Sequence, residues 1–328
     1  MTGLLTADPR QFPQPYRHRH FGFAVVVIAL LVMSGQRVGI DRALTMSSGA
    51  VLAPLGLGPP SPVADALGRG LGQLWPLQVE TREDVSRLPD FDAKNLPPFS
   101  HLEKIPSPTP GARSDEVQAT ILVQPLGYIS HVAIKMLETL EIALWGTLVA
   151  IVLGLPLALL GARNITPVQV VRVAARGFVA VLRAVPELIS ALFLVMAFGF
   201  GPIPGLLALG FHAGGFLGKF YADDMEASEP APQRALLAIG ASRLAVWRVA
   251  VLPQVMPQFI AYTLYIFDRN VRMATVIGLV GAGGIGQELR GRFDMYQFGH
   301  VGTILVATLA VVGLIDVTSN RLRKAAGL

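Results

Sequence analysis

The run LETLEIALWGTLVAIVLGLPLALL at residues 137–160 decides the fold, because residues 143–160 carry no charged side chain. A helix that crosses a lipid bilayer needs about 20 mainly apolar residues. Further segments meet this measure at residues 21–40, 178–200, 206–222, 254–280 and 301–320. We therefore expect an all-α membrane protein with about six transmembrane helices.

The composition of the whole chain supports the same interpretation. The 328 residues are 52% hydrophobic and 15% charged, with a mean hydropathy of +0.53, whereas a soluble domain usually carries about 25% charged residues. The net charge is +5, but the basic residues form short clusters beside apolar runs. A nucleic-acid partner would need one basic face, so none is expected. The absence of cysteine excludes disulfides, cysteine–zinc clusters and thiol redox chemistry.

Lysine and arginine in short loops are retained on the cytoplasmic side of a membrane. If the N-terminus is inside, the predicted cytoplasmic pieces carry Arg17 and Arg19; Arg163, Arg172 and Arg176; Arg234, Arg243 and Arg248; and Arg321, Arg323 and Lys324. The short outer loop 201–205 carries none, and the loop around Arg290 and Arg292 carries two. We expect both termini, residues 1–20 and 321–328, to be cytoplasmic in a multi-pass protein of the cell inner membrane.

The first apolar run follows the basic stretch at residues 17–20, as in a secretory signal. No small-x-small cleavage site follows it cleanly, since Gly35, Gln36 and Arg37 break the pattern. We therefore favour a retained anchor helix at residues 21–40 over a cleaved signal.

Residues 41–135 form a predicted external insertion before the membrane domain at 136–320. This segment is rich in proline, with Pro59-Pro60, Pro97-Pro98 and a PSPTP run at residues 106–110, and it has no long apolar helix. Two interpretations stay open. The insertion is either a partly irregular docking element, with patches at 74–77 and 90–99, or a poorly ordered tether.

The predicted cytoplasmic segment 223–252 begins polar, becomes amphipathic at residues 235–239, and then reads Gly240-Ala241-Ser242. Ser242 is placed to cap a second short helix before Leu252 and Pro253 start the next span. Two short helices around a glycine bend fit the groove of a partner protein. The alternative is an ordinary connecting loop.

At these residues the sequence resembles the membrane subunits of ABC importers, whose cytoplasmic loop carries the EAA motif: Glu-Ala-Ala, three residues, Gly, nine residues, Ile, one residue, Leu-Pro. Ala235, Gly240, Leu252 and Pro253 stand at matching positions. Arg234, Leu236 and Ala250 replace the Glu, the second Ala and the Ile. The resemblance implies an ATPase-coupling loop made by Arg234, Ala235, Gly240, Ala241, Ser242, Leu252 and Pro253.

The resemblance extends over residues 136–328 and is strongest to the phosphonate-importer branch. It is carried by ALWGT at 143–147, RAVPEL at 183–188, FHAGGFLGK at 211–219, GASRL at 240–244, LPQVMPQF at 252–259 and residues 274–286. It implies a five-helix importer core at about 137–320 that works by alternating access. It also implies a second copy of this chain, two separate ATPase subunits and an external substrate-binding protein as partners.

A charged side chain at mid-bilayer costs about 2.5 to 3.5 kcal/mol, so such residues usually face a pathway or a partner. We expect Arg269 and Arg272, with Asn270 as a neutral donor, to receive a phosphorus oxyanion, because arginine fits tetrahedral oxyanions. The candidate pathway residues are Glu187, His212, Asp268, Arg269, Asn270 and Arg272. Three structural alternatives stay open: an Asp268–Arg272 ion pair, a Glu187–Arg183 ion pair, and His212 as a packing residue.

Gly281, Gly283 and Gly286 match the dinucleotide pattern G-x-G-x-x-G, but only 42 residues follow them and no acidic residue stands about 20 positions on. With Gly284, they instead predict a broken helix or re-entrant turn that acts as a gate near the outer face. A phosphate-gripping loop is missing from the chain, so ATP-Mg is expected on the partner ATPase and no cofactor on this chain.

Two rival functions stay open. One is an importer for phosphite, hypophosphite or another small solute instead of phosphonate. The other, from a different class, is a membrane-anchored scaffold or sensor that uses the external insertion to bind a partner.

Overall fold

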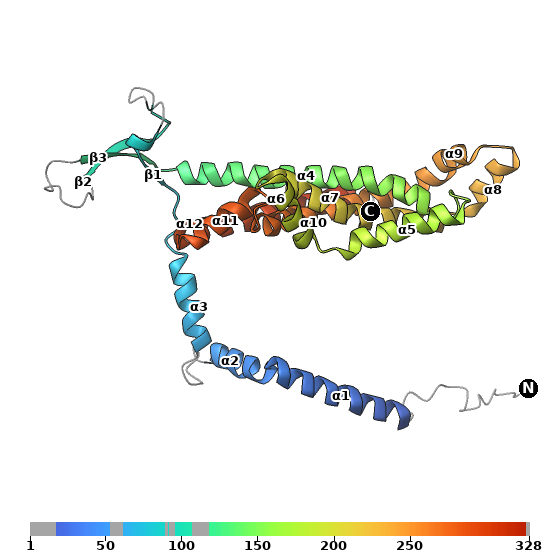
Figure 1. The fold of residues 1–328 in the computed structure, drawn as a ribbon, viewed down its shortest axis with the longest axis horizontal. Coiled ribbons are helices and arrows are strands. Elements are labelled where there is room, and N and C mark those ends of the chain that lie inside the picture. The colour runs from blue at the N-terminus through green and yellow to red at the C-terminus, as the bar shows by residue number, and fades with distance from the viewer. Residues whose placement is uncertain (1–17, 53–61, 89–90, 92–95, 107–117, 326–328) are drawn as a thin grey trace, which may run out of the picture. The chain divides into compact units, whose positions relative to one another are not determined.

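The computed structural model describes residues 18–52, 62–88, 91, 96–106 and 118–325 (Figure 1). The chain divides into two compact units, Met1–Gln73 and Leu74–Leu328. In its described residues, the first unit contains three helices: α1 His18–Val38, α2 Ile40–Leu52 and α3 Pro62–Gln73. Helix α1 covers residues 21–38 of the predicted anchor span 21–40 and exposes its apolar side chains, and it passes as a candidate span only together with α2. It meets α2 at a 70° bend at Gly39, whose φ of +77° favours glycine.

The second unit opens with a small antiparallel sheet in the region predicted to be partly irregular. Its strands are β1 Thr81–Asp84, β2 His101–Pro106 and β3 Gln118–Gln124, in the order β1-β3-β2. Thr81 pairs with Gln124, and His101 pairs with Val123. A backbone hydrogen bond of 3.2 Å from Tyr128 to the Val79 carbonyl joins the segment before β1 to the first turn of α4, Gly127–Gly161.

The predicted patch at residues 74–77 lies against its own chain, on the first turns of α12, Phe298–Ala325. Gln78 donates its backbone N–H to the Gly299 carbonyl at 3.2 Å, and Thr303 donates its hydroxyl to the Gln78 carbonyl at 2.6 Å. A Cβ atom on Gly302 would come within 2.5 Å of the Leu74 carbonyl oxygen. Half of the other predicted patch, residues 90 and 92–95 of 90–99, lies outside the described residues.

The rest of the second unit is a helical bundle, as the sequence predicts. Its remaining long helices are α5 Gln169–Ala184, α6 Glu187–Phe198, α7 Pro202–Ala227, α10 Leu252–Gly278 and α11 Gly284–Asp294. Helix α7 packs against α4, α5, α6 and α10, so it forms the centre of the bundle.

Glycines let α7 and α4 approach closely. A Cβ atom on Gly154 of α4 would lie 3.0 Å from the backbone nitrogen of Gly218 on α7, and one on Gly210 would lie 2.5 Å from a methyl group of Val149. Small residues at helix interfaces let two backbones make van der Waals contact inside a membrane. The glycine content of residues 205–218 is therefore the reason that α7 occupies the middle.

Among the described residues, three helices are long and apolar enough to cross a membrane, or up to five if each of two bent pairs is one span. The predicted spans 137–160, 254–280 and 301–320 lie in α4, α10 and α12. The predicted span 178–200 is broken, because α5 and α6 meet at 86° around Pro186. Proline has no backbone N–H and disfavours helical geometry in the residue before it.

The predicted span 206–222 corresponds to α7, which is longer, at 26 residues. It does not count as a span by length and composition, because glycines, His212 and Lys219 lower its hydropathy. Its burial among the other helices replaces the apolar surface that a lipid-facing helix needs.

We predict that Gly154→Val destabilises the bundle, since overpacking a tight contact costs about 1 to 3 kcal/mol. The unfolding temperature of the detergent-solubilised protein should fall by several degrees, at roughly 2 to 4 °C per kcal/mol. Gly177→Val on α5 is the matched control, because a Cβ atom there has no neighbour within 4 Å. Equal melting of the two variants would contradict the close α4–α7 contact.

Candidate functional site

A helical hairpin projects from one end of the bundle (Figure 1) and contains most of the predicted segment 223–252, whose first residues, 223–227, instead form the last turn of α7. It consists of α8 Pro230–Ala238, a bend at Gly240, α9 Arg243–Val246 and a π-helical turn Trp247–Val251 that continues into α10. Gly240 has a φ of +82°, which only glycine adopts without strain. Ser242 caps α9 by accepting the backbone N–H of Ala245 at 3.3 Å, as the sequence predicts.

Apolar side chains on this hairpin are exposed. Ile239 is 80% exposed and Leu244 is 71% exposed, with Leu237 and Val249 also on the surface. Arg234, which replaces the motif Glu, is exposed on α8 as well. Solvent-exposed apolar side chains on an otherwise polar hairpin form a surface that can bind another protein.

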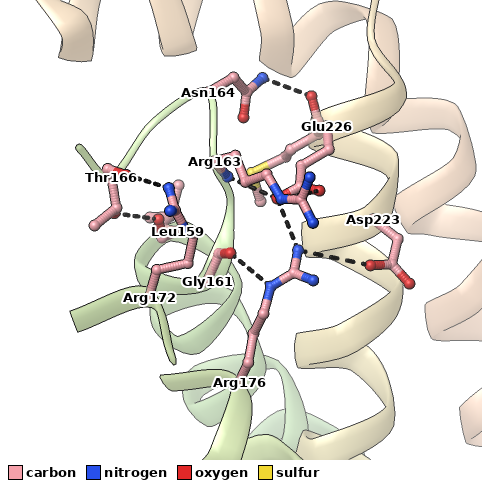
Figure 2. A network of polar contacts seen from close by, with 10 residues as sticks. Leu159, Gly161, Arg163, Asn164, Thr166, Arg172, Arg176, Asp223 and Glu226 are labelled. Atoms are coloured by element: carbon pink, nitrogen blue, oxygen red, sulfur yellow. Dashed lines mark hydrogen bonds and ion pairs between the residues drawn. The ribbon is translucent and has the colours of Figure 1, made fainter. Parts of the chain in front are cut away.

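Figure 2 shows the polar network that holds the loop between α4 and α5 onto the end of α7. The Glu226 carboxylate accepts from the Arg176 guanidinium at 2.7 Å and from the Arg163 backbone N–H at 2.7 Å. Arg176 also donates its Nε to the Gly161 carbonyl at 2.9 Å and lies 3.9 Å from the Asp223 carboxylate. One carboxylate near the end of α7 thus joins α7 to α5 and to the loop after α4.

The same network reaches the hairpin. Asn164 donates its side-chain amide to the Met225 carbonyl at 2.6 Å and to Gln233 of α8 at 3.4 Å. Gln254 at the start of α10 accepts the Glu229 backbone N–H at 2.9 Å, which closes the base of the hairpin. The sequence interpretation treated Arg163 and Arg176 only as orientation signals, because Glu226 lies 50 residues after Arg176.

Three helices meet at a buried carboxylate in the middle of the bundle. Glu187 of α6 accepts a hydrogen bond from the Arg269 guanidinium of α10, and it lies 3.3 Å from Nε2 of His212 on α7. The other imidazole nitrogen of His212 lies 2.9 Å from the Val185 carbonyl. The break at Pro186 leaves this carbonyl outside the helical ladder and places Glu187 in the first turn of α6.

The alternative Glu187–Arg183 pair is wrong, because Glu187 has Arg269 and His212 as partners. The backbone turns by 86° between α5 and α6, so the one-turn spacing of Arg183 and Glu187 has no helical meaning. His212 has a partner on both ring nitrogens, which agrees with the alternative that it packs between helices.

Two further predicted pathway residues have partners within the bundle. Asp268 is buried and pairs with Arg272 one turn later, at 2.5 and 3.2 Å, as the structural alternative proposed. Asn270 is fully buried and donates to the Thr147 hydroxyl of α4 at 3.0 Å. Asn270 therefore lies in the packing of α10 against α4 and not beside Arg269 and Arg272.

The predicted gate glycines lie in the turn between α10 and α11 and in the first residues of α11. Gly281, Gly283 and Gly284 have φ values of +94°, +84° and +69°, and a Cβ atom on Gly286 would clash with the Thr275 carbonyl of α10. The chain therefore breaks and reverses here, as the glycine pattern indicates. The gate function itself stays a prediction.

Residues of α4 that the sequence interpretation missed cap the helix after this turn. Glu138 accepts the Gly284 backbone N–H at 3.0 Å, and Thr139 accepts that of Ile285 at 2.8 Å. The Lys135 ammonium group forms an ion pair with the Glu138 carboxylate at 2.7 Å. The available signal was a glutamate at the edge of an apolar run, where a carboxylate needs a specific partner.

Further along α11, Glu288 joins the helix to two basic residues. Its carboxylate accepts from Arg292 at 2.7 Å and lies 3.2 Å from His131. Burial raises the pKa of Glu288, but its hydrogen bonds with Arg292 and His131 outweigh burial and leave that pKa below its ordinary value.

Two known proteins resemble the chain over different lengths. It is 49% identical over 257 residues to HtxE, a candidate phosphite transport system permease protein of Stutzerimonas stutzeri, which covers 76% of this chain and 98% of HtxE. It is 45% identical over 119 residues to PhnE2, a candidate cryptic phosphonate transport system permease protein of Escherichia coli K12, which covers 36% of this chain and 98% of PhnE2.

The fold resembles that of a solved importer. An inward-facing MetNI methionine ABC transporter aligns with a TM-score of 0.52 at 22% identity, over 60% of this chain and 95% of that chain. The sequence profile of one family matches residues 150–325, more than half of the chain. The chain therefore belongs to the family of binding-protein-dependent transport system inner membrane components.

Proposed function

We propose that this chain is the transmembrane subunit of an ATP-binding-cassette importer that moves a small phosphorus oxyanion, a phosphonate or phosphite, into the cytoplasm by alternating access. The observation that carries the proposal is the hairpin with exposed Ile239 and Leu244, whose base is held by the Asn164–Gln233 and Glu229–Gln254 hydrogen bonds. The similarity to HtxE and PhnE2, both named for phosphorus oxyanions, supports the substrate class.

The hairpin docks in a groove of a separate ATPase that binds ATP-Mg, so this chain is a pore subunit without catalytic residues. The exposed apolar side chains of α8 and α9 enter the groove, and Gly240 sets the angle between the two helices. Because Arg234 stands in place of the motif Glu, we expect it to pair with an acidic side chain of the ATPase.

The working assembly contains two copies of this chain, two ATPase subunits and an external substrate-binding protein. Both termini and the hairpin lie in the cytoplasm, and residues 41–135 lie outside. In this orientation the three-stranded sheet and the turn at Gly281 face the binding protein.

The charges on α10 divide into two roles. Asp268 neutralises Arg272 within one helix, so this pair has a structural role in α10 and does not depend on the position of another helix. Glu187 neutralises Arg269 across two helices, so their pair changes if α6 and α10 move apart. We propose the Glu187–Arg269 pair as the charged element that alternating access makes and breaks.

Gly240→Pro should abolish ATP-dependent uptake while membrane insertion is unchanged, because proline cannot adopt the φ of +82° that the bend needs. Uptake of phosphite is measured in proteoliposomes with the partner ATPase and binding protein, and ATPase retention is measured by co-purification. Gly177→Ala, at an open helical position of α5, is the control. Normal uptake by Gly240→Pro would remove the docking role from the hairpin.

A double variant separates transport from stability at the central pair. Glu187→Gln alone leaves the Arg269 charge partly buried without its carboxylate, and breaking such a pair costs about 3 to 5 kcal/mol. Glu187→Gln with Arg269→Gln should recover most of the unfolding temperature and still transport poorly. Wild-type uptake by the double variant would leave the pair a purely structural role.

A further inference from the structure

Helices α4, α5 and α7 enclose a cavity of about 170 Å³ at the hairpin end of the bundle. Its polar wall is made by Arg176 and Arg183 of α5 and by Lys219 and Asp223 of α7. Gly218 and Ala180 leave the space open, because larger side chains there would fill it. The volume suits an anion of a few heavy atoms.

The ion pairs of the bundle leave two cations of this cavity without an acidic partner. On α5, α7 and α10, Arg176 pairs with Glu226, Arg269 with Glu187, and Arg272 with Asp268. Arg172 reaches only the Thr166 carbonyl, in the loop before α5. Arg183 and Lys219 have no ion pair with any described residue, and both line the cavity.

Arg183 is held in place but has unused hydrogen-bonding capacity. Its guanidinium carbon lies 4.9 Å from the centre of the Phe216 ring, a cation–π distance. Its Nε is buried and has no hydrogen-bond partner among the described residues. The guanidinium carbon of Arg269 lies 5.4 Å from the centre of the same Phe216 ring. The ring therefore places Arg183 close to the Glu187–Arg269 pair.

Lys219 is exposed on α7, about two turns before the helix ends at Ala227. An ammonium group facing lipid is costly, so this position indicates a polar space next to the helix. The cavity supplies that space. Arg176, bound to Glu226, lies on the same cavity wall and belongs to the network below the hairpin.

We propose that Arg183 and Lys219 form a transit site in this chain for one small tetrahedral oxyanion. This inference rests on the proposed function and names the residues that hold the substrate inside the membrane domain. Two positive charges without an acidic partner, one of them a planar guanidinium held against the Phe216 ring, are complementary to such an anion.

A second cavity, of about 470 Å³, lies at the sheet end of this unit and also contains arginines. There, Arg82 pairs with Glu80 and Arg292 pairs with Glu288, so its positive charges are already neutralised. Because only the smaller cavity has cationic side chains without an acidic partner among the described residues, we assign the anion site to it.

The test uses the complex of this chain with its ATPase in lipid nanodiscs, without the binding protein. Calorimetric titration with phosphite, methylphosphonate, phosphate and sulfate should give one saturable site per chain for a phosphorus anion, and the four arms identify which anion binds. Arg183→Gln and Lys219→Gln should each raise the dissociation constant about tenfold or more, because each removes a charge-assisted contact. Arg183→Lys and Lys219→Arg should retain most of the affinity.

Arg172→Gln is the matched control, since it removes one charge from α5 outside the cavity. The inference is overturned if the wild-type complex binds none of the four anions, or if the two Gln variants weaken binding no more than the control. Uptake of phosphite at the wild-type rate by both Gln variants would overturn the transit site and leave the proposed function intact. A complete system that imports no phosphorus anion would overturn the proposed function itself.

Discussion

The pairing of charges inside an apolar bundle is the constraint on which the rest of this structure depends. Lipid and packed side chains solvate ions poorly, so each charge on a bundle helix needs a partner or a polar space. Glu187 meets this need through Arg269 and His212, which come from two other helices. The positions of α6, α7 and α10 are therefore fixed by one carboxylate, and a change in that pairing changes all three helices.

Backbone features bring these charges together. Pro186 ends α5, turns the chain by 86° and starts α6 at Glu187. Gly154 and Gly218 let α4 and α7 approach until their backbones touch, which places α7 at the centre. Without the proline, Glu187 would continue the face of α5 beside Arg183, and the two residues would neutralise each other one turn apart.

The sequence predicted the features that depend on local chemistry. Apolar runs located α4, α10 and α12, and Gly240 and Ser242 gave the bend and the cap of the hairpin. Contacts distant in sequence were not predictable, because the spacing of Glu187 favours Arg183 and nothing local indicates Arg269, 82 residues away. The sheet was missed because its strands have only 4 to 7 residues and lie in a proline-rich segment. Helix α7 has a low hydropathy because the neighbouring helices, and not lipid, cover it. The composition of a single helix does not reveal which surface covers it.

The hairpin and the interior charges are connected through contiguous contacts. Gln233 of α8 reaches Asn164, whose loop also donates a backbone N–H to Glu226. Glu226 holds Arg176, which lines the same cavity as Arg183, and Arg183 shares the Phe216 ring with Arg269. This chain of contacts gives energetic coupling a physical basis, because each step is a hydrogen bond, an ion pair, a shared cavity wall or a cation–π contact. A shift of α8 would alter the Gln233–Asn164 contact first, the Glu226 contacts next and then the charge facing the cavity.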